Sequence, residues 1–163
     1  MDGICMEIES GKEIEHEHLE NVVEFLKVFV DKCHHTKEEE YLFPLMKRTN
    51  IPGSTDIIDS LLQEHERGRR NVDMIAGEVS ANMDSEALST IAKCSRDYIE
   101  LLTEHINKED NILFPLADQH LAQKTQENLL KSFEIVEIEK IGEGKHEEFH
   151  KMLHNLKEIY VMV

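Results

Sequence analysis

An eleven-residue pattern occurs twice in this chain, as HHTKEEEYLFP over residues 34–44 and as HINKEDNILFP over residues 105–115. Both copies place a histidine ten residues before a proline, a carboxylate four residues after that histidine, and Leu-Phe-Pro at the end. Residues i and i+4 share one face of a helix, so each copy presents a histidine beside a glutamate. Imidazole nitrogen and carboxylate oxygen together suit iron, manganese or zinc. Two such helices facing each other would bring four ligands to one point, where the carboxylates could bridge two metal ions.

The size and composition of the chain predict one mostly helical domain over residues 1–163. A chain of 163 residues is long enough to bury a sizeable core. Charged residues make up 32% of the chain and aromatic residues 6%, which is typical of a helical protein rich in Leu, Glu and Lys. The formal net charge of −16 argues against nucleic-acid binding, which needs clustered Lys and Arg. We expect no membrane span, because no run of about 18 apolar residues occurs.

The three cysteines indicate the redox environment. Cys5, Cys33 and Cys94 show no CxxC spacing, and the last two fall on apolar helical faces. We therefore expect reduced packing residues in a cytoplasmic protein. The first ten residues lack the basic start and the apolar run of a signal peptide, which fits the same expectation.

Apolar residues at helical spacing predict four long amphipathic segments. Their apolar faces extend over residues 14–47, 58–79, 91–116 and 123–163, the last interrupted at residues 142–144. Short connections between such segments are typical of an all-α fold, an antiparallel up-and-down four-helix bundle. In this interpretation residues 14–120 form the core helices and residues 123–163 form a C-terminal helical extension.

A rotation of about 100° per residue assigns the residues of the repeat to helix faces. His105 and Glu109 both fall within roughly 20° of the centre of the apolar stripe of their helix. In the first copy His34 lies near the stripe and Glu38 at its margin, whereas His35 points well away. The repeat register and the geometry therefore agree on His34 with Glu38.

A third helix also directs a histidine to its apolar face. His65 is central on its helix, and Gly68 beside it leaves room that a larger side chain would fill. One such histidine is more often a hydrogen-bonded core residue, and one HxxxE pair is usually solvated. Three inward histidines and two inward glutamates favour a metal site over these two explanations, because burying five polar groups without a metal ion is costly. We interpret this set as a metal site.

The C-terminal run GKHEEFHKMLHNL adds three histidines at spacings of four. His146 lies on the flank of the apolar face of this segment and is a candidate extra ligand. His150 lies at the edge of that face and His154 outside it, so both are expected at the surface.

Together these residues resemble the hemerythrin-like HHE cation-binding family. The resemblance extends from about Leu19 to the C-terminus and rests on CHHTKEEEYLFPL, LLQEHERGR and YIELLTEHINKEDNILFPLA. It implies a four-helix bundle with a non-haem di-iron centre, in which histidines cap the irons and carboxylates bridge them. The iron ligands that it implies are His34, Glu38, His65, His105 and Glu109, with Glu38 and Glu109 as the bridges. Zinc or manganese are possible substitutes for iron.

The beginning of the chain departs from this family. The family opens with a helix whose Glu-His motif supplies a further ligand, whereas MDGICMEIESGKEIEHEHLE resembles only the tail of that helix and the following loop. We therefore expect the first family helix to be shortened or missing. Five ligands cannot fill two octahedral irons, so waters, His146 or a partner chain would complete the site. The C-terminal helix, or a second chain in a homodimer, would cover the apolar groove left open.

The resemblance implies a protein that binds dioxygen or a related small diatomic such as nitric oxide, for sensing, storage or stress response. Binding rather than turnover is the leading expectation. One alternative is a di-iron redox protein resembling the iron–sulfur cluster repair proteins. Another is a degenerate bundle that holds a single metal ion and is kept for interaction.

Overall fold

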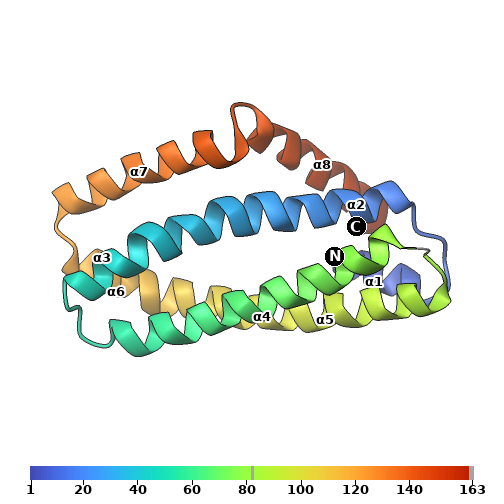
Figure 1. Ribbon diagram of the computed structural model, residues 1–163, viewed down its shortest axis with the longest axis horizontal. Coiled ribbons are helices and arrows are strands. Elements are labelled where there is room, and N and C mark those ends of the chain that lie inside the picture. The colour runs from blue at the N-terminus through green and yellow to red at the C-terminus, as the bar shows by residue number, and fades with distance from the viewer. Residues whose placement is uncertain (82, 162–163) are drawn as a thin grey trace.

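The computed structural model describes residues 1–81 and 83–161, and within these ranges every regular element is a helix. Six helical stretches follow one another along the chain (Figure 1). Their elements are α1 (Asp2–Glu9), α2 (His16–Phe25), η1 (Leu26–His35), η2 (Lys37–Leu42), α3 (Phe43–Arg48), α4 (Ser54–Ser80), α5 (Ser85–Lys108), η3 (Glu109–Leu113), α6 (Phe114–His120), α7 (Gln123–Ile141) and α8 (Lys145–Tyr160). The single-domain interpretation over residues 1–163 includes residues 82, 162 and 163, which lie outside the described ranges.

Two of the long rods contain π-helical turns, and both copies of the repeat lie there. The first rod continues from α2 through η1 and η2 into α3, and another continues from α5 through η3 into α6. The π-helical η2 and η3 end at the leucine of each Leu-Phe-Pro, and Pro44 and Pro115 lie in the first turn of α3 and α6 that follow. Proline has no N–H to donate to the carbonyl four residues earlier, so the α-helical hydrogen-bond pattern is interrupted at these points.

The rods pack side by side along most of their length (Figure 1). α4 packs against α5, and α2 packs against α4. The short α1 lies on α5, where the sequence predicted only the tail of a missing helix. α7 runs along η1 and η2, and α8 contacts α1 and α2 (Figure 1). The predicted C-terminal extension is therefore helical and covers the outer side of the first rod.

The apolar core is divided into two clusters. One gathers residues of α1, α2, α4, α5 and α8 around Val22, Ile75 and Ile91. The other gathers residues of α3, α4 and α6 around Met46 and Leu61. Along α4 and along the α5–α6 rod, buried polar residues interrupt the apolar positions between these clusters. A layer of buried polar residues therefore lies in the middle of the core, between the two apolar clusters.

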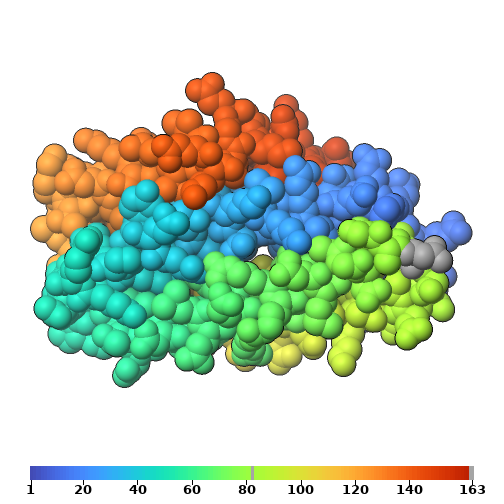
Figure 2. All heavy atoms as spheres, viewed as in Figure 1, coloured from blue at the N-terminus to red at the C-terminus, as the bar shows by residue number. Residues whose placement is uncertain are grey.

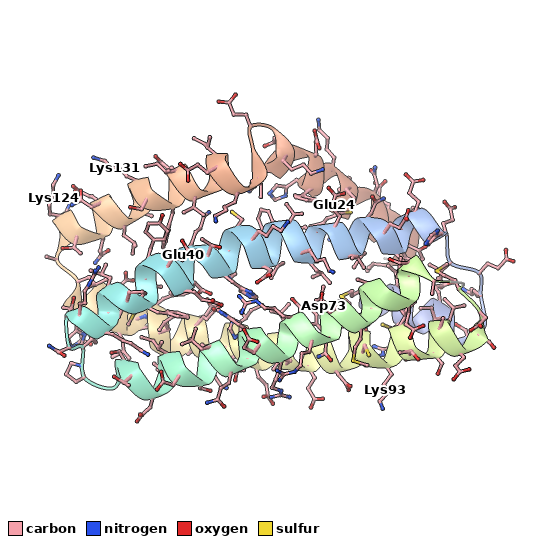
Figure 3. All side chains as sticks on the ribbon, in the orientation of Figure 1. Glu24, Glu40, Asp73, Lys93, Lys124 and Lys131 are labelled. Atoms are coloured by element: carbon pink, nitrogen blue, oxygen red, sulfur yellow. The ribbon has the colours of Figure 1, made fainter. Side chains whose placement is uncertain are left out.

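The outer faces of the rods carry charged side chains. Exposed charged residues include Glu24, Glu40 and Lys131, which are labelled in Figure 3. All three cysteines are buried and free, which confirms the prediction that they are packing residues. In the part of the chain that the structure describes, no helix is both long and apolar enough to cross a membrane.

Candidate metal centre

Five buried side chains, each from a different element, meet in the polar layer between the two apolar clusters. They come from the end of η1, from η2, from α4, and from the α5–η3 junction, and they are His35, Glu38, His65, His105 and Glu109. Two overlapping groups have ligand atoms within 4.8 Å of one another: His35 with His65 and His105, and Glu38 with His65, His105 and Glu109. Both groups share His65 and His105, so the five residues form one continuous cluster.

The inward-facing atoms of this cluster lie close together without satisfying one another. His65 Nε2 lies 3.3 Å from a carboxylate oxygen of Glu38, and His105 Nε2 lies 2.9 Å from Glu109 Oε1. Even so, both oxygens of Glu38, Oε1 of Glu109 and Nε2 of the two histidines are buried without a hydrogen-bond partner. Buried polar atoms without partners are costly and rare. A cation between them would satisfy all five, so the residues fit a bound metal ion.

The outward-facing nitrogens of the three buried histidines are each held by a carboxylate. Nδ1 of His65 donates a hydrogen bond to Glu39 at 2.7 Å, and Nδ1 of His105 donates one to Glu64 at 3.0 Å. Nδ1 of His35 makes the same contact with Asp31 at 3.1 Å. With the proton on Nδ1, each ring presents the lone pair of Nε2 to the interior, as a metal ligand requires.

Two cations in turn hold these three carboxylates. The Arg69 guanidinium donates to Asp31 at 2.7 Å and to Glu39 at 2.6 Å, and it therefore serves two histidines at once. The ammonium of Lys108 pairs with Glu64, the partner of His105. The chain thus compensates the charges around the cluster with specific ion pairs, although its net charge is strongly negative.

The ionisation of the cluster follows from its burial. Burial and the nearby Glu109 carboxylate together raise the pKa of Glu38 to about 7, against the lowering effect of His65. Burial alone would lower the pKa of His65, but the nearby carboxylates of Glu38 and Glu39 outweigh it and raise this pKa to about 9. Without metal the cluster therefore retains protons near neutral pH, and a cation would replace them.

The structure brings four of the six predicted ligands together, namely Glu38, His65, His105 and Glu109. His34 is not among the grouped residues: its side chain is 43% exposed, and its Nε2 lies 3.7 Å from Glu38. The prediction that His35 points away from the core is wrong, because His35 is buried in the cluster. The face assignment assumed 3.6 residues per turn, whereas His35 ends a π-helical stretch with more residues per turn.

His146 lies apart from the cluster. Its ring packs against Phe29 and His150, with centroid separations of 5.6 Å and 4.5 Å. α8 contacts α1 and α2, which places His146 over the first rod rather than in the polar layer. Gly142 and Gly144 precede α8 with positive φ angles of 83° and 82°, and these turns set its direction.

The sequence reasoning also missed the carboxylates behind the histidines. These carboxylates are Asp31, Glu39 and Glu64, none of which the sequence pattern singled out. A signal for one of them exists, because Asp31 precedes His35 by four residues and so shares its helix face. The other two contacts join different elements and have no local sequence pattern.

A cleft of about 150 Å³ connects this layer with the surface between η1 and α4. It is lined by His35, Asp31, Arg69, Gly68 and Tyr98, among others. Figure 2 shows the molecule hollowed between the first rod and α4. A small molecule could therefore approach the cluster on the His35 side.

Comparison with known proteins adds an independent finding. The family model described as Hemerythrin HHE cation binding domain matches residues 4–117. Uncharacterized proteins of Mycobacterium bovis and of two Mycobacterium tuberculosis strains are 28% identical to the chain over 128 residues. These matches cover 77% of this chain and 49% of each relative, so the chain spans about half the length of these relatives. No solved structure matches the chain.

Proposed function

This chain belongs to the hemerythrin HHE cation-binding family, and from that premise we propose that it is a non-haem di-iron protein that binds dioxygen or nitric oxide. The observation that carries the proposal is the convergence of five buried, unsatisfied donor atoms on one point. We propose His35, Glu38, His65, His105 and Glu109 as the ligands, with Glu38 and Glu109 between two ions. When bound, ferrous iron supplies the electrons that a diatomic ligand accepts.

The residues around the site have separate roles in this proposal. The carboxylates behind the histidines fix the ring orientation and hold a proton on Nδ1, so that Nε2 is the nitrogen available to a metal ion. The two apolar clusters on either side exclude water from the polar layer, which favours a small, weakly polar ligand. The cleft beside His35 gives such a ligand a route to the site.

We extend the proposal to the fold. The α2–α3 rod, α4 and the α5–α6 rod, together with α1, correspond to the antiparallel four-helix arrangement of the family. In this correspondence α1 takes the place of a shortened first helix. The family match begins at residue 4, within α1, and α1 packs on α5, which supports this correspondence. The chain spans about half the length of the relatives that it matches, so the activity of a longer protein containing this domain is a separate proposal.

The test is anaerobic reconstitution with ferrous iron, followed by metal analysis and optical spectroscopy. We expect about two iron ions per chain and a spectrum that changes on exposure to dioxygen or nitric oxide and reverts when the gas is removed. Irreversible turnover would favour the alternative of a redox protein resembling the iron–sulfur cluster repair proteins. One ion per chain and no response to gas would favour the single-metal alternative.

The ligand assignment is tested by substitution. His105→Ala and Glu109→Ala should each remove most of the bound metal, because both donors are buried at the point of convergence. His154→Ala is the matched control, because this histidine is exposed on α8 and pairs with Glu158 of the same helix. Full metal occupancy in the His105 variant would show that the site lies elsewhere.

A further inference from the structure

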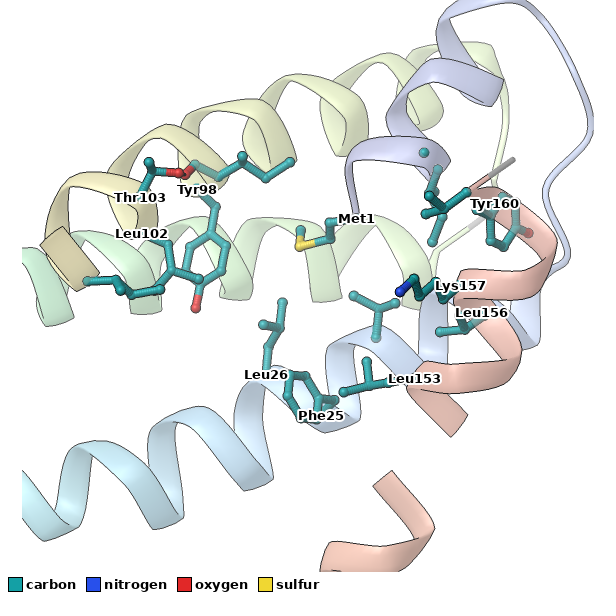
Figure 4. Close-up of a pocket in the computed structure, with 16 residues that line it drawn as sticks. Met1, Phe25, Leu26, Tyr98, Leu102, Thr103, Leu153, Leu156, Lys157 and Tyr160 are labelled. Atoms are coloured by element: carbon teal, nitrogen blue, oxygen red, sulfur yellow. The ribbon is translucent and has the colours of Figure 1, made fainter. Parts of the chain in front are cut away.

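A second concave site lies beside the metal centre and has a different chemistry. Four helices, α1, α2, α5 and α8, enclose a cavity of about 340 Å³ (Figure 4). Its walls are aliphatic and aromatic, with contributions from Ile4, Val22, Phe25, Leu26, Leu102 and Leu156. Small-molecule sites in proteins are typically apolar and have volumes of about 300–1,000 Å³. The cavity therefore has room for one small apolar molecule.

The close approach of α8 to α1 builds the outer wall of this cavity. Gly3 lies directly against the backbone of Tyr160, and a Cβ atom at residue 3 would overlap the Tyr160 carbonyl oxygen. The hydroxyl of Tyr160 contacts His18 Nδ1 at 2.7 Å, which ties the end of α8 to α2 as well. Specific contacts thus hold the wall in place.

Two hydroxyl groups of the lining are already engaged in hydrogen bonds. The Thr103 hydroxyl donates to the carbonyl of Ile99 within its own helix, and the Tyr160 hydroxyl is held by His18. Lys157 is different: Figure 4 shows its ammonium end directed into the cavity from α8. Lys157 forms no ion pair with any of the residues that the structure describes. The described part of the chain offers no counter-charge to this exposed ammonium, and its position at the rim of an apolar cavity favours a ligand with a negative head.

The inner end of the cavity borders the metal centre. Tyr98 and Leu102 line the cavity, and both also line the small space around His35, His65 and His105. One layer of side chains thus separates the two sites. A ligand with its head at Lys157 would place its apolar end against Tyr98 and Leu102.

We propose that this cavity binds an amphipathic monocarboxylate, with the carboxylate on Lys157 and the hydrocarbon chain between α1, α2 and α5. The negative head matches the Lys157 ammonium, and the apolar chain matches the cavity walls. A second copy of the chain fits less well. Stable protein interfaces bury about 1,200–2,000 Å² in total, far more than one cavity bounded by four helices of the same chain offers.

The test is calorimetric titration of the full chain with decanoate, in the metal-loaded and in the chelator-treated protein. We expect decanoate to bind in both forms, because the cavity contains none of the proposed metal ligands. Lys157→Met keeps the aliphatic stem and should raise the decanoate Kd about tenfold, as expected for the loss of one charge-assisted contact. Lys151→Met, an exposed lysine of the same helix outside the cavity, should leave the Kd unchanged.

Two further measurements make the outcome decisive. Decanol has the same chain without the charge and should bind about tenfold more weakly than decanoate. Leu153→Trp at the rim should block the cavity while circular dichroism shows unchanged helix content. No binding of decanoate, equal binding of decanol, or equal effects of the two lysine substitutions would overturn the proposal. A dimer in light scattering that Leu153→Trp dissociates would overturn it as well, and would assign the cavity to a second copy.

Discussion

The imidazole of His35 stacks on that of His65, with ring centroids 3.8 Å apart and planes inclined by 17°. The two rings come from η1 and α4, and the carboxylates behind them share one cation, Arg69. Stacking and the shared cation make the two histidines a single unit. The position of His35 is therefore fixed by tertiary contacts as well as by its own helix.

This pairing leads to a prediction that separates two adjacent histidines. His35→Ala should lower the metal affinity of the protein at least about tenfold, because it removes a buried donor and the ring that supports His65. His34→Ala should change metal affinity much less, because its side chain is 43% exposed and stands outside the grouped donors. Metal analysis after dialysis against a graded chelator checks both variants. Greater metal loss in the His34 variant would reverse the assignment.

A second prediction concerns Arg69. Arg69→Met keeps an aliphatic side chain but leaves Asp31 and Glu39 without their shared cation, so His35 and His65 lose their fixed orientation. Outer partners of this kind are worth about 10–100-fold in metal affinity, and we expect a loss in this range. Arg70→Met is the control, because Arg70 is exposed on the same helix and lines no space beside the cluster. Equal affinities of the two variants would show that Arg69 is only a surface ion pair.

The helical periodicity of the sequence was sufficient for most of the fold and for part of the site. It predicted that the first rod begins between residues 14 and 19 and ends at about residue 47. In the structure this rod extends from His16 to Arg48. The resemblance to the HHE family is confirmed by the family match over residues 4–117. Repeat spacing and face angles selected Glu38, His65, His105 and Glu109, and the structure groups these four residues in one cluster.

The remainder of the site depends on features that periodicity does not contain. His35 was missed because the π-helical turns before it change the angle per residue. Glu39 and Glu64 were missed because their histidine partners lie on other elements, and only the packed structure brings them together. The direction of α8 was open because glycines 142 and 144 permit many paths, and the structure turns it toward α1 and α2 instead of the cluster.

A third prediction uses two glycines of α4. Gly77 has open space around it, so Gly77→Ala should raise the free energy of unfolding by about 0.5–1 kcal/mol through helix propensity. At Gly68 a Cβ atom would lie 3.2 Å from Cε2 of Tyr98, a buried ring beside the cluster. The steric conflict should cancel the gain in propensity, so Gly68→Ala should stabilise the protein less or destabilise it. Denaturant titration measures the free energy of unfolding of both variants. Equal stabilisation would show that the Tyr98 ring can move to make room for the added methyl group.

The last prediction concerns pH and follows from the protons that the metal-free cluster retains. The folded pKa of His65 is about 9 against an ordinary value of 6.5, and that of Glu38 is about 7 against 4.5. Both are raised, so their contributions to stability are fully present below the ordinary values and are lost as pH rises through the folded values. The metal-free protein should therefore become less stable between about pH 5 and pH 9 on account of these groups.

Metal binding should show the opposite trend over the same window. A cation needs His65 and Glu38 without their protons, so binding releases protons and affinity rises with pH, about tenfold per unit for each proton released. The melting temperatures of the zinc-loaded and metal-free proteins should diverge from pH 6 to pH 9, since zinc avoids redox changes during the measurement. Scanning calorimetry at four pH values, with His154→Ala as the control, measures this gap. A gap that stays constant with pH would mean that the bound metal displaces no proton from this cluster.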